Sequence, residues 1–141
     1  KISEKSGKTY TLPTEAQWEY AARGGKNANS TKYAGSNYPS VVAWYGKKEG
    51  TTQLCGTKQA NSLGIYDMSG NVNEWCKDWY SDSYLSYDTK NPEGPSSGND
   101  FRVVRGGNWH YGVYDCRVSA RSRSVTWNRL NYLGFRVVCL P

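Results

Sequence analysis

Residues Leu12–Gly25 read LPTEAQWEYAARGG and predict the one clearly signalled helix of the chain. Thr14 and Gln17 have the spacing of a capping box, in which the hydroxyl accepts from a first-turn amide and the glutamine reaches back to the cap. Trp18 and two alanines fall on one side of this helix. Two glycines follow Arg23 and are typical of a helix end. We therefore expect a helix that begins after Thr14, ends at Arg23 and packs through Trp18.

The rest of the sequence predicts short strands joined by long loops. Residues 26–39 and 78–100 are rich in Asn, Ser, Gly, Tyr and Pro and lack a hydrophobic period. Such segments are loops, and loops held by a rigid framework commonly carry function. This pattern predicts the α+β class. The strand candidates are Val41–Tyr45, Val72–Lys77, Arg102–Arg105, Cys116–Ala120 and Phe135–Cys139.

The positive charge is concentrated near the end of the chain. Residues 1–101 contain equal numbers of basic and acidic side chains, whereas residues 102–141 contain seven arginines and one acid, Asp115. A basic segment suits nucleic acid or another acidic ligand. Isolated arginines between short strands also pair with internal carboxylates and carbonyls. Because no lysine accompanies these arginines, we favour internal pairing and expect no nucleic-acid partner.

The four cysteines and the single histidine give little sign of catalysis. The cysteines are far apart and form no CxxC pair, which argues against a zinc finger. Three disulfide pairings are open; we favour Cys76–Cys116, with reduced core cysteines as the alternative. His110 has no marked nucleophile beside it, and phosphate-loop, GxSxG and HExxH motifs are missing. We therefore expect no catalytic triad.

Three blocks of sequence together resemble the formylglycine-generating-enzyme/sulfatase-modifying-factor family. They are Leu12–Gly25, LGIYDMSGNVNEWCKDWY at Leu63–Tyr80, and RVVRGG…GFRVV within Arg102–Val138. The resemblance covers nearly the whole chain. It implies a C-type lectin-like fold with short strands, many loops and a face built from loops. We interpret residues 1–141 as a single domain of this type that lacks its N-terminal part.

The oxidase chemistry of this family does not transfer to the sequence. The enzymes hold copper with two cysteine thiolates in the stretch that follows the GG pair of the third block, and soft thiolates suit Cu(I). Here residues 108–115 read NWHYGVYD, without a cysteine, and Cys116 follows alone. Asn108 stands where the family usually has Ser. The comparison of motifs therefore predicts no copper and no oxidase activity.

The second block also carries the family's calcium site. By resemblance, its ligands are the carboxylates of Asp67 and Glu74 and the carbonyls of Gly70 and Val72. A set of oxygen ligands around a tight turn suits a hard cation. The alternative is a turn whose two acids accept from amides or pair with arginine. Asn73 stands where the family usually has Trp, which implies different local packing.

The third block alternates a framework with gaps. This pattern resembles the variable region of diversity-generating retroelement proteins, in which template adenines are randomised, chiefly at Asn codons, and a C-type lectin scaffold displays the products. We interpret residues 102–138 as such a variable region. Randomised Asn codons never yield Lys, Glu, Gln, Met or Trp. All twenty Lys, Glu, Gln and Met residues lie within residues 1–101, which supports this interpretation.

The gap residues have the composition of a binding surface. Tyr supplies rigid contact area, while Ser, Gly and Asn adapt to a ligand. Trp127 is out of reach of an Asn codon, so it is either framework or has a different template codon. The candidate ligand-binding residues are His110, Tyr111, Gly112, Val113, Tyr114, Asp115, Ala120, Ser122, Arg123, Ser124, Val125, Trp127, Leu130, Asn131 and Tyr132.

The sequence therefore predicts a binding module and not an enzyme. The expected partner is a protein or another macromolecule, bound by a monomer at the cell surface, which the resemblance implies. No stretch has the length and apolarity of a membrane span, so we expect no membrane insertion in this segment. The alternative is a structural or accessory domain of the same family. The two hypotheses differ in one structural expectation: only the binding module requires the gap residues to form one exposed face.

Overall fold

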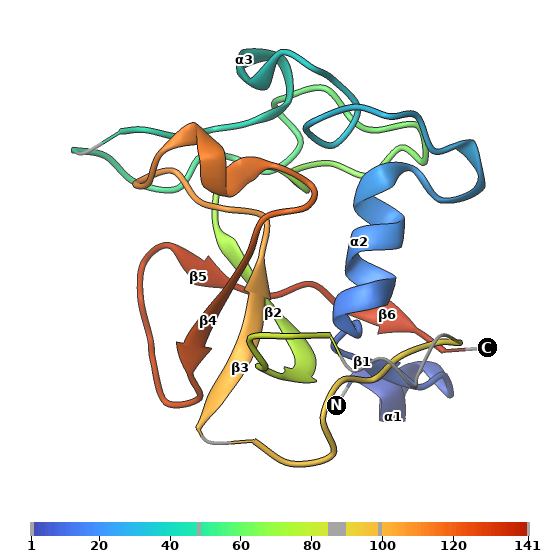
Figure 1. The fold of residues 1–141 in the computed structure, drawn as a ribbon. Coiled ribbons are helices and arrows are strands. Elements are labelled where there is room, and N and C mark those ends of the chain that lie inside the picture. The colour runs from blue at the N-terminus through green and yellow to red at the C-terminus, as the bar shows by residue number, and fades with distance from the viewer. Residues whose placement is uncertain (1, 48, 85–89, 99, 141) are drawn as a thin grey trace.

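The computed structural model describes residues 2–47, 49–84, 90–98 and 100–140. A four-stranded sheet lies at its centre, helix α2 packs against the sheet, and a two-stranded sheet joins segments near the termini (Figure 1). Long loops form the other end of the molecule. The elements are α1 (Ile2–Ser6), β1 (Tyr10–Thr11), α2 (Glu15–Arg23), η1 (Gly25–Asn27), α3 (Pro39–Val42), β2 (Asn73–Trp79), β3 (Phe101–Arg105), η2 (Val113–Cys116), β4 (Arg121–Val125), β5 (Leu133–Gly134) and β6 (Val138–Cys139).

Helix α2 is formed as predicted. Thr14 Oγ1 accepts from the Gln17 amide at 3.1 Å, and Gln17 Oε1 accepts from the Thr14 amide at 2.9 Å. Gly24 ends the helix in a left-handed conformation with φ 100°, which favours glycine. Trp18 is buried in the core, so this helix presents its predicted face to the sheet.

The strand order of the main sheet is β4–β3–β2–β5. β3 pairs antiparallel with β2 and β4, and β5 lies parallel to β2. Glu74, Arg105 and Arg121 occupy adjacent positions across three strands. Because side chains alternate along a strand, these residues point to one face, which α2 covers, while Val104 and its partner Ser122 point to the other.

Two of the predicted strands are confirmed, and three predictions need correction. Arg102–Arg105 lies within β3 and Val72–Lys77 largely coincides with β2. Val41–Tyr45 was predicted as a strand, but Pro39–Val42 forms helix α3, because proline suits a first helical turn. Of Phe135–Cys139, only the last two residues form a strand, β6.

The third correction concerns the segment that leads into the edge of the sheet. Cys116–Ala120 forms no strand; η2 ends at Cys116 and a turn follows. The strand follows directly after this segment: it is β4 at Arg121–Val125, whose sequence RSRSV contains one apolar residue. Without alternating apolar residues, β4 carries no hydrophobic signal that sequence analysis detects.

The core consists of two neighbouring clusters that separate the buried cysteines. Cys76 belongs to the cluster around Trp18 and Met68, whereas Cys116 packs with Tyr33 in the other. All four cysteines are free thiols, so the predicted Cys76–Cys116 disulfide is wrong. Burial raises the pKa of Cys116 to about 12 and raises that of Cys76 further, which keeps both thiols protonated at neutral pH.

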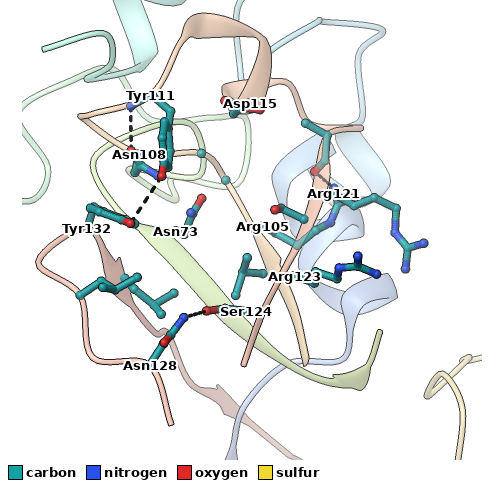
Figure 2. Close-up of a pocket in the computed structure, with 17 residues that line it drawn as sticks. Asn73, Arg105, Asn108, Tyr111, Asp115, Arg121, Arg123, Ser124, Asn128 and Tyr132 are labelled. Carbon is teal, nitrogen blue, oxygen red and sulfur yellow. Dashed lines mark hydrogen bonds between the residues drawn. The ribbon is translucent and has the colours of Figure 1, made fainter. Parts of the chain in front are cut away.

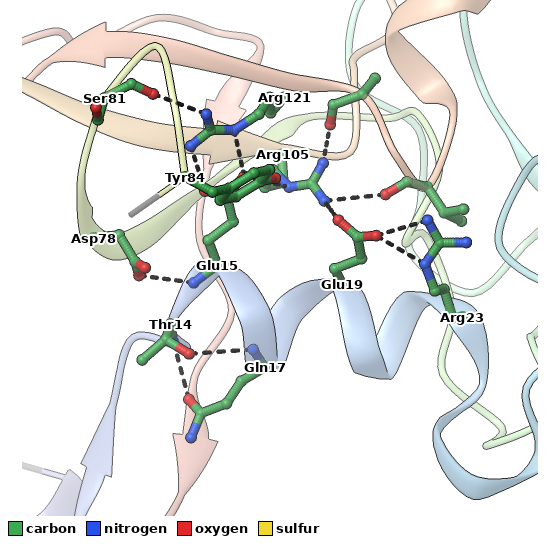
Figure 3. Close-up of polar contacts among 12 residues, drawn as sticks. Thr14, Glu15, Gln17, Glu19, Arg23, Asp78, Ser81, Tyr84, Arg105 and Arg121 are labelled. Atoms are coloured by element: carbon green, nitrogen blue, oxygen red, sulfur yellow. Dashed lines mark hydrogen bonds and ion pairs between the residues drawn. The ribbon is translucent and has the colours of Figure 1, made fainter. Parts of the chain in front are cut away.

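A buried arginine joins α2 to the sheet (Figure 3). The side chain of Arg105 is fully buried, and its Nη2 donates to the Glu19 carboxylate and to the Val118 carbonyl. Its Nε lies 3.2 Å from Glu15 Oε1, and its Nη1 donates to the Ala120 carbonyl. Two carboxylates and two carbonyls therefore surround one guanidinium, which is the compensation that a buried charge needs.

Arg121 extends this network to the edge of the sheet. Its Nε and Nη2 donate to the two oxygens of Glu15 at 2.9 and 2.6 Å, and its Nη1 donates to the Ser81 carbonyl at 2.8 Å. Asp78 Oδ2 accepts from the Glu15 amide at 2.7 Å. Burial raises the pKa of this Asp78 carboxyl. The first turn of α2 is thereby tied to β2 and β4 together.

We expect Arg105→Ala to destabilise the domain by about 3–5 kcal/mol, because it leaves two carboxylates near the core without their shared cation. A loss of this size is a large fraction of the free energy of unfolding of a native domain, which is about 5–15 kcal/mol. Urea unfolding followed by tryptophan fluorescence measures the change. Lys77→Ala is the control: the Lys77–Glu93 pair is exposed, and its loss should cost less than about 1 kcal/mol. Equal effects of the two substitutions would contradict the central role of Arg105.

Candidate ligand-binding site

A pocket of about 380 Å³ opens on the face of the sheet that lies away from α2. Val104 of β3 and Ser122 and Ser124 of β4 line it from the sheet. Arg121 and Arg123 of β4 also border the pocket, but their side chains point away from it toward the α2 side (Figure 2). The sheet therefore divides the molecule into a charged, internally paired face and a more neutral face that opens to solvent.

Three separate stretches of the predicted variable region meet at this pocket. Tyr111 and Asp115 come from the segment around η2, Ser122 and Ser124 from β4, and Tyr132 from the loop before β5. Of the candidate residues, those that line the pocket are Tyr111, Asp115, Ala120, Ser122, Arg123, Ser124, Leu130 and Tyr132. The candidates outside it are His110, Gly112, Val113, Tyr114, Val125, Trp127 and Asn131.

The candidates outside the pocket have different environments. Tyr114 and Trp127 are among the most exposed aromatic side chains, at 69% and 65%. Val113 packs against the core cluster that contains Cys116, so its side chain points inward. Val125 is half-buried at the end of β4. The segment His110–Asp115 thus supplies both surface residues and one structural residue.

Tyr111 and Tyr132 form an aromatic wall of the pocket, and the His110 ring packs against both. The His110 ring stacks on Tyr132 at 5.9 Å, and both contact the Tyr111 ring edge-on at 5.2 and 5.5 Å. The two tyrosine hydroxyls lie 3.5 Å apart, and this hydrogen bond raises the pKa of Tyr132. The rings come from two segments that are distant in sequence, so each segment orients the other.

Asn108 holds the first of these segments in place from below. It is completely buried, and its Oδ1 accepts from the amides of His110 and Tyr111, each at 2.9 Å (Figure 2). The left-handed φ of Gly107, 70°, precedes it, and a Cβ there would meet the Asp115 backbone at 2.7 Å. The chain therefore leaves β3 by a turn that only glycine fits, and Asn108 fixes the start of the loop that carries Tyr111.

Three asparagines of the pocket were not among the predicted ligand-binding residues. Asn73, Asn108 and Asn128 all line it, and Asn128 Nδ2 donates to Ser124 Oγ at 2.8 Å. Asn73 lies far from the third block in sequence and reaches the site because β2 pairs with β5. Its one signal in the sequence is that a small amide replaces the Trp of the related enzymes, which leaves room at this position.

The predicted calcium ligands lie on the turn before β2 and at its start. Glu74 is buried, and both of its oxygens accept from Arg136, at 2.5 and 2.7 Å, while Oε2 also accepts from Trp18 Nε1. Asp67 Oδ2 accepts from the Gly56 amide at 2.7 Å. Its buried Oδ1 has no hydrogen-bond partner among the described residues. The donor set thus has one open oxygen on Asp67, whereas Glu74 is already paired.

The site is suited to binding by shape and hydrogen bonding. Aromatic rings, amides and hydroxyls surround it, and among the described residues Asp115 is the one acidic residue that lines it. In the part of the chain that the structure describes, no three His, Cys, Asp or Glu side chains are grouped to hold a metal ion. None of the described helices is long and apolar enough to cross a membrane.

Comparisons with known proteins assign the chain to a family. The sulfatase-modifying factor enzyme 1-like domain matches residues 1–140. The chaperone protein LppX of Paenibacillus barcinonensis is 41% identical in an alignment of 128 positions that covers 78% of this chain and 42% of that protein. The formylglycine-generating enzyme of Mus musculus is 36% identical in an alignment of 143 positions that covers 89% of this chain and 38% of the enzyme. The chain spans less than half the length of these relatives.

Among solved structures, variable protein 1 of Treponema denticola superposes with a TM-score of 0.84 and is 39% identical. The superposition covers 95% of this chain and 49% of that protein. The similarity confirms the predicted α+β, C-type lectin-like fold of the formylglycine-generating-enzyme type. Both the motifs and the fold thus agree with the match over residues 1–140: the chain belongs to the sulfatase-modifying factor enzyme 1-like domain family.

Proposed function

We propose that the protein is a ligand-binding display module, a diversity-generating retroelement variable protein whose loops near the C-terminus form the binding face. The observation that carries this proposal is the meeting of three sequence segments, around Tyr111, Ser122 and Tyr132, at one pocket. The similarity to variable protein 1 of Treponema denticola supports it independently. The partner is a protein or another macromolecule, bound by a monomer at the cell surface.

The energetics of the domain support a variable face at this position. Arg105 and its carboxylates stabilise the domain from the other side of the sheet, so residues of the pocket are not needed for that network. Most substitutions at exposed positions change the free energy of unfolding by at most about 0.5 kcal/mol. Side chains can vary at a surface only if the stability of the domain comes from other residues. Tyr111 and Ser122 meet this condition, because they lie on the side of the sheet away from the Arg105 network.

The arginines support a protein ligand over a nucleic acid. Arg105 and Arg121 pair with Glu15, and Arg136 pairs with Glu74. Arg102 lies over the Trp79 ring, 3.9 Å from its centroid. A surface that follows phosphates needs several free cations. Three of the seven arginines of residues 102–141 are instead paired with buried carboxylates of the domain.

The binding-face proposal predicts that replacing Tyr111, Tyr114 and Tyr132 together by Ser leaves the melting temperature within a few degrees of the parent. Randomising the pocket-lining candidates in a displayed library should then yield folded clones that bind either of two unrelated purified target proteins selectively. The matched library randomises Asn108, Cys116 and Val118, which are buried. We expect it to yield few folded clones. Loss of folding in the triple variant, or no selective binders, would favour a structural or accessory domain.

We also propose that the protein lacks the oxidase activity of the related enzymes. The Cys116 thiol is buried and protonated, and no second cysteine lies in the stretch that follows Gly107. Aerobic incubation with Cu(I) and a cysteine-containing sulfatase peptide should leave the peptide unchanged by mass spectrometry. A catalytically competent formylglycine-generating enzyme is the positive control. Copper-dependent formation of the aldehyde would overturn the non-enzymatic proposal.

Calcium is proposed at the turn before β2. The open Oδ1 of Asp67 and the carbonyls of Gly70 and Val72 suit a hard cation, and Glu74 would join them by sharing an oxygen with Arg136. Calcium at a hundredfold excess over Kd should stabilise the fold by about 2.7 kcal/mol. Asp67→Asn should abolish this gain, whereas Glu74→Gln is a poor test because it also breaks the ion pair. Identical thermal unfolding in calcium and in EDTA would exclude the site.

A further inference from the structure

β4 is an edge strand, and one side of its backbone is open. It pairs with β3 alone, and the strand order places no strand beyond it in the described part of the chain. Its five residues make it as long as β3. Unpaired N–H and C=O groups along such an edge are a template for another strand. β4 also lies inside the proposed variable region, next to the pocket.

The hydrogen-bond pattern shows which backbone groups of β4 are open. The Thr126 amide donates to the Asp100 carbonyl at 2.9 Å, which continues the β3–β4 ladder. Bonded and non-bonded pairs alternate in an antiparallel ladder, so Ser122 and Ser124 bond to β3 while Arg121 and Arg123 do not. The N–H and C=O of Arg121 and Arg123 therefore point away from β3, and no described residue bonds to them.

The opposite strand supports the same assignment. The Tyr80 amide donates to the Phe101 carbonyl at 2.9 Å, so the backbone of Phe101 faces β2. Phe101 lies opposite Val125, which has the parity of Arg123. The Val125 carbonyl points away from β3 and accepts from the Asn128 amide in the following turn. The open stretch of the edge is thus centred on Arg123.

The side chains beside this edge differ between the two faces of the sheet. Ser122 and Ser124 face the neutral pocket. On the other face, the Arg123 guanidinium lies 5.0 Å from the Tyr80 and Phe101 ring centroids, and its side chain is 50% exposed. Its ion-pair partner Asp82 is 3.6 Å away and 90% exposed, a geometry that contributes little to stability. Arg123 is therefore oriented by two rings and available to another carboxylate.

We propose that β4 docks an extended segment of a protein ligand as an added strand, with an acidic side chain against Arg123 and neutral side chains directed into the pocket beside Ser122 and Ser124. The inference rests on the proposed binding function and names the partner's chemistry. Main-chain hydrogen bonds supply affinity in this mode and alternate side chains supply specificity. Because the bonds do not depend on the side chains of β4, the edge keeps its function when those side chains vary.

Charge favours an acidic segment over a second copy of this chain. Two β4 strands related by a twofold axis through Arg123 would bring two guanidinium groups together across the new strand pair. Like charges directly opposite in a sheet are destabilising. An acidic residue at that position would instead replace the weak Asp82 contact.

The test uses a blocked, fluorescently labelled peptide of alternating Thr and Glu, with a Thr–Lys peptide as the charge control. Fluorescence anisotropy should show saturable binding of the Thr–Glu peptide and at least about tenfold weaker binding of the Thr–Lys peptide. Two further Thr–Glu peptides are N-methylated on the backbone, one at every Thr and the other at every Glu. Since successive N–H groups of a strand point to opposite edges, one of these peptides should lose binding and the other should keep it.

Two variants separate the backbone from the charge. Arg123→Ala removes the cation and keeps the N–H, whereas Arg123→Pro removes both and spares the bonds to β3, as proline does at an open edge. We expect weaker binding by Arg123→Ala, none by Arg123→Pro, and similar melting temperatures for both. Amide hydrogen exchange should be fast at Arg121 and Arg123 in the free protein and slowed by the Thr–Glu peptide, with Ser122 and Ser124 protected throughout.

The outcomes distinguish this inference from the function on which it rests. Equal binding of the two N-methylated peptides, or no binding of the Thr–Glu peptide, would overturn the added strand. Selective binders from the displayed library would still support the binding face. A dimer in sedimentation velocity that Arg123→Pro dissociates would identify a second copy as the occupant and overturn the acidic segment. If the displayed library yields no selective binders but the Thr–Glu peptide binds, recognition takes place at the β4 edge and not in the pocket.

Discussion

The ion network around Arg105 is the interaction on which the other features of the structure depend. One buried guanidinium contacts Glu15 and Glu19 of α2 and two carbonyls of the turn before β4. Such a charge is stable only if every partner is in place. The network therefore fixes the helix, the central strand and the turn in one arrangement. It also explains why a polar chain with short strands can hold a defined shape around a small core.

The position of the binding pocket follows from this arrangement. Arg105 ends β3, and Gly106 and Gly107 then turn the chain toward Asn108, which anchors the loop with Tyr111. The charges that determine the fold lie on the α2 face, whereas the pocket lies on the other face. A substitution of Tyr111, Ser122 or Tyr132 consequently leaves the ion pairs of Arg105 with Glu15 and Glu19 untouched.

The parts of the structure that the sequence predicted are those with a local signal. Thr14 and Gln17 act on neighbouring atoms, so the α2 cap is predictable from the spacing of two residues. β4 has no such signal, because its position is set by Arg121 binding Glu15 more than a hundred residues away. Asn73 was not predicted as a pocket residue for a similar reason, because a long-range contact, the parallel pairing of β2 with β5, brings it to the pocket. Long-range pairing of this kind is invisible to a local pattern.

The two-residue period of β4 gives neighbouring positions different roles. Arg121 belongs to the network with Glu15, whereas Ser122 lines the pocket. Arg123 has the parity of Arg121 but lies beyond the reach of α2, over Tyr80 and Phe101. Its ion-pair partner is the exposed Asp82, so Arg123 stands apart from the network although it points to the same face. Substitutions along β4 consequently alter side chains on both faces of the sheet edge, while the backbone pairing of β4 with β3 does not depend on those side chains.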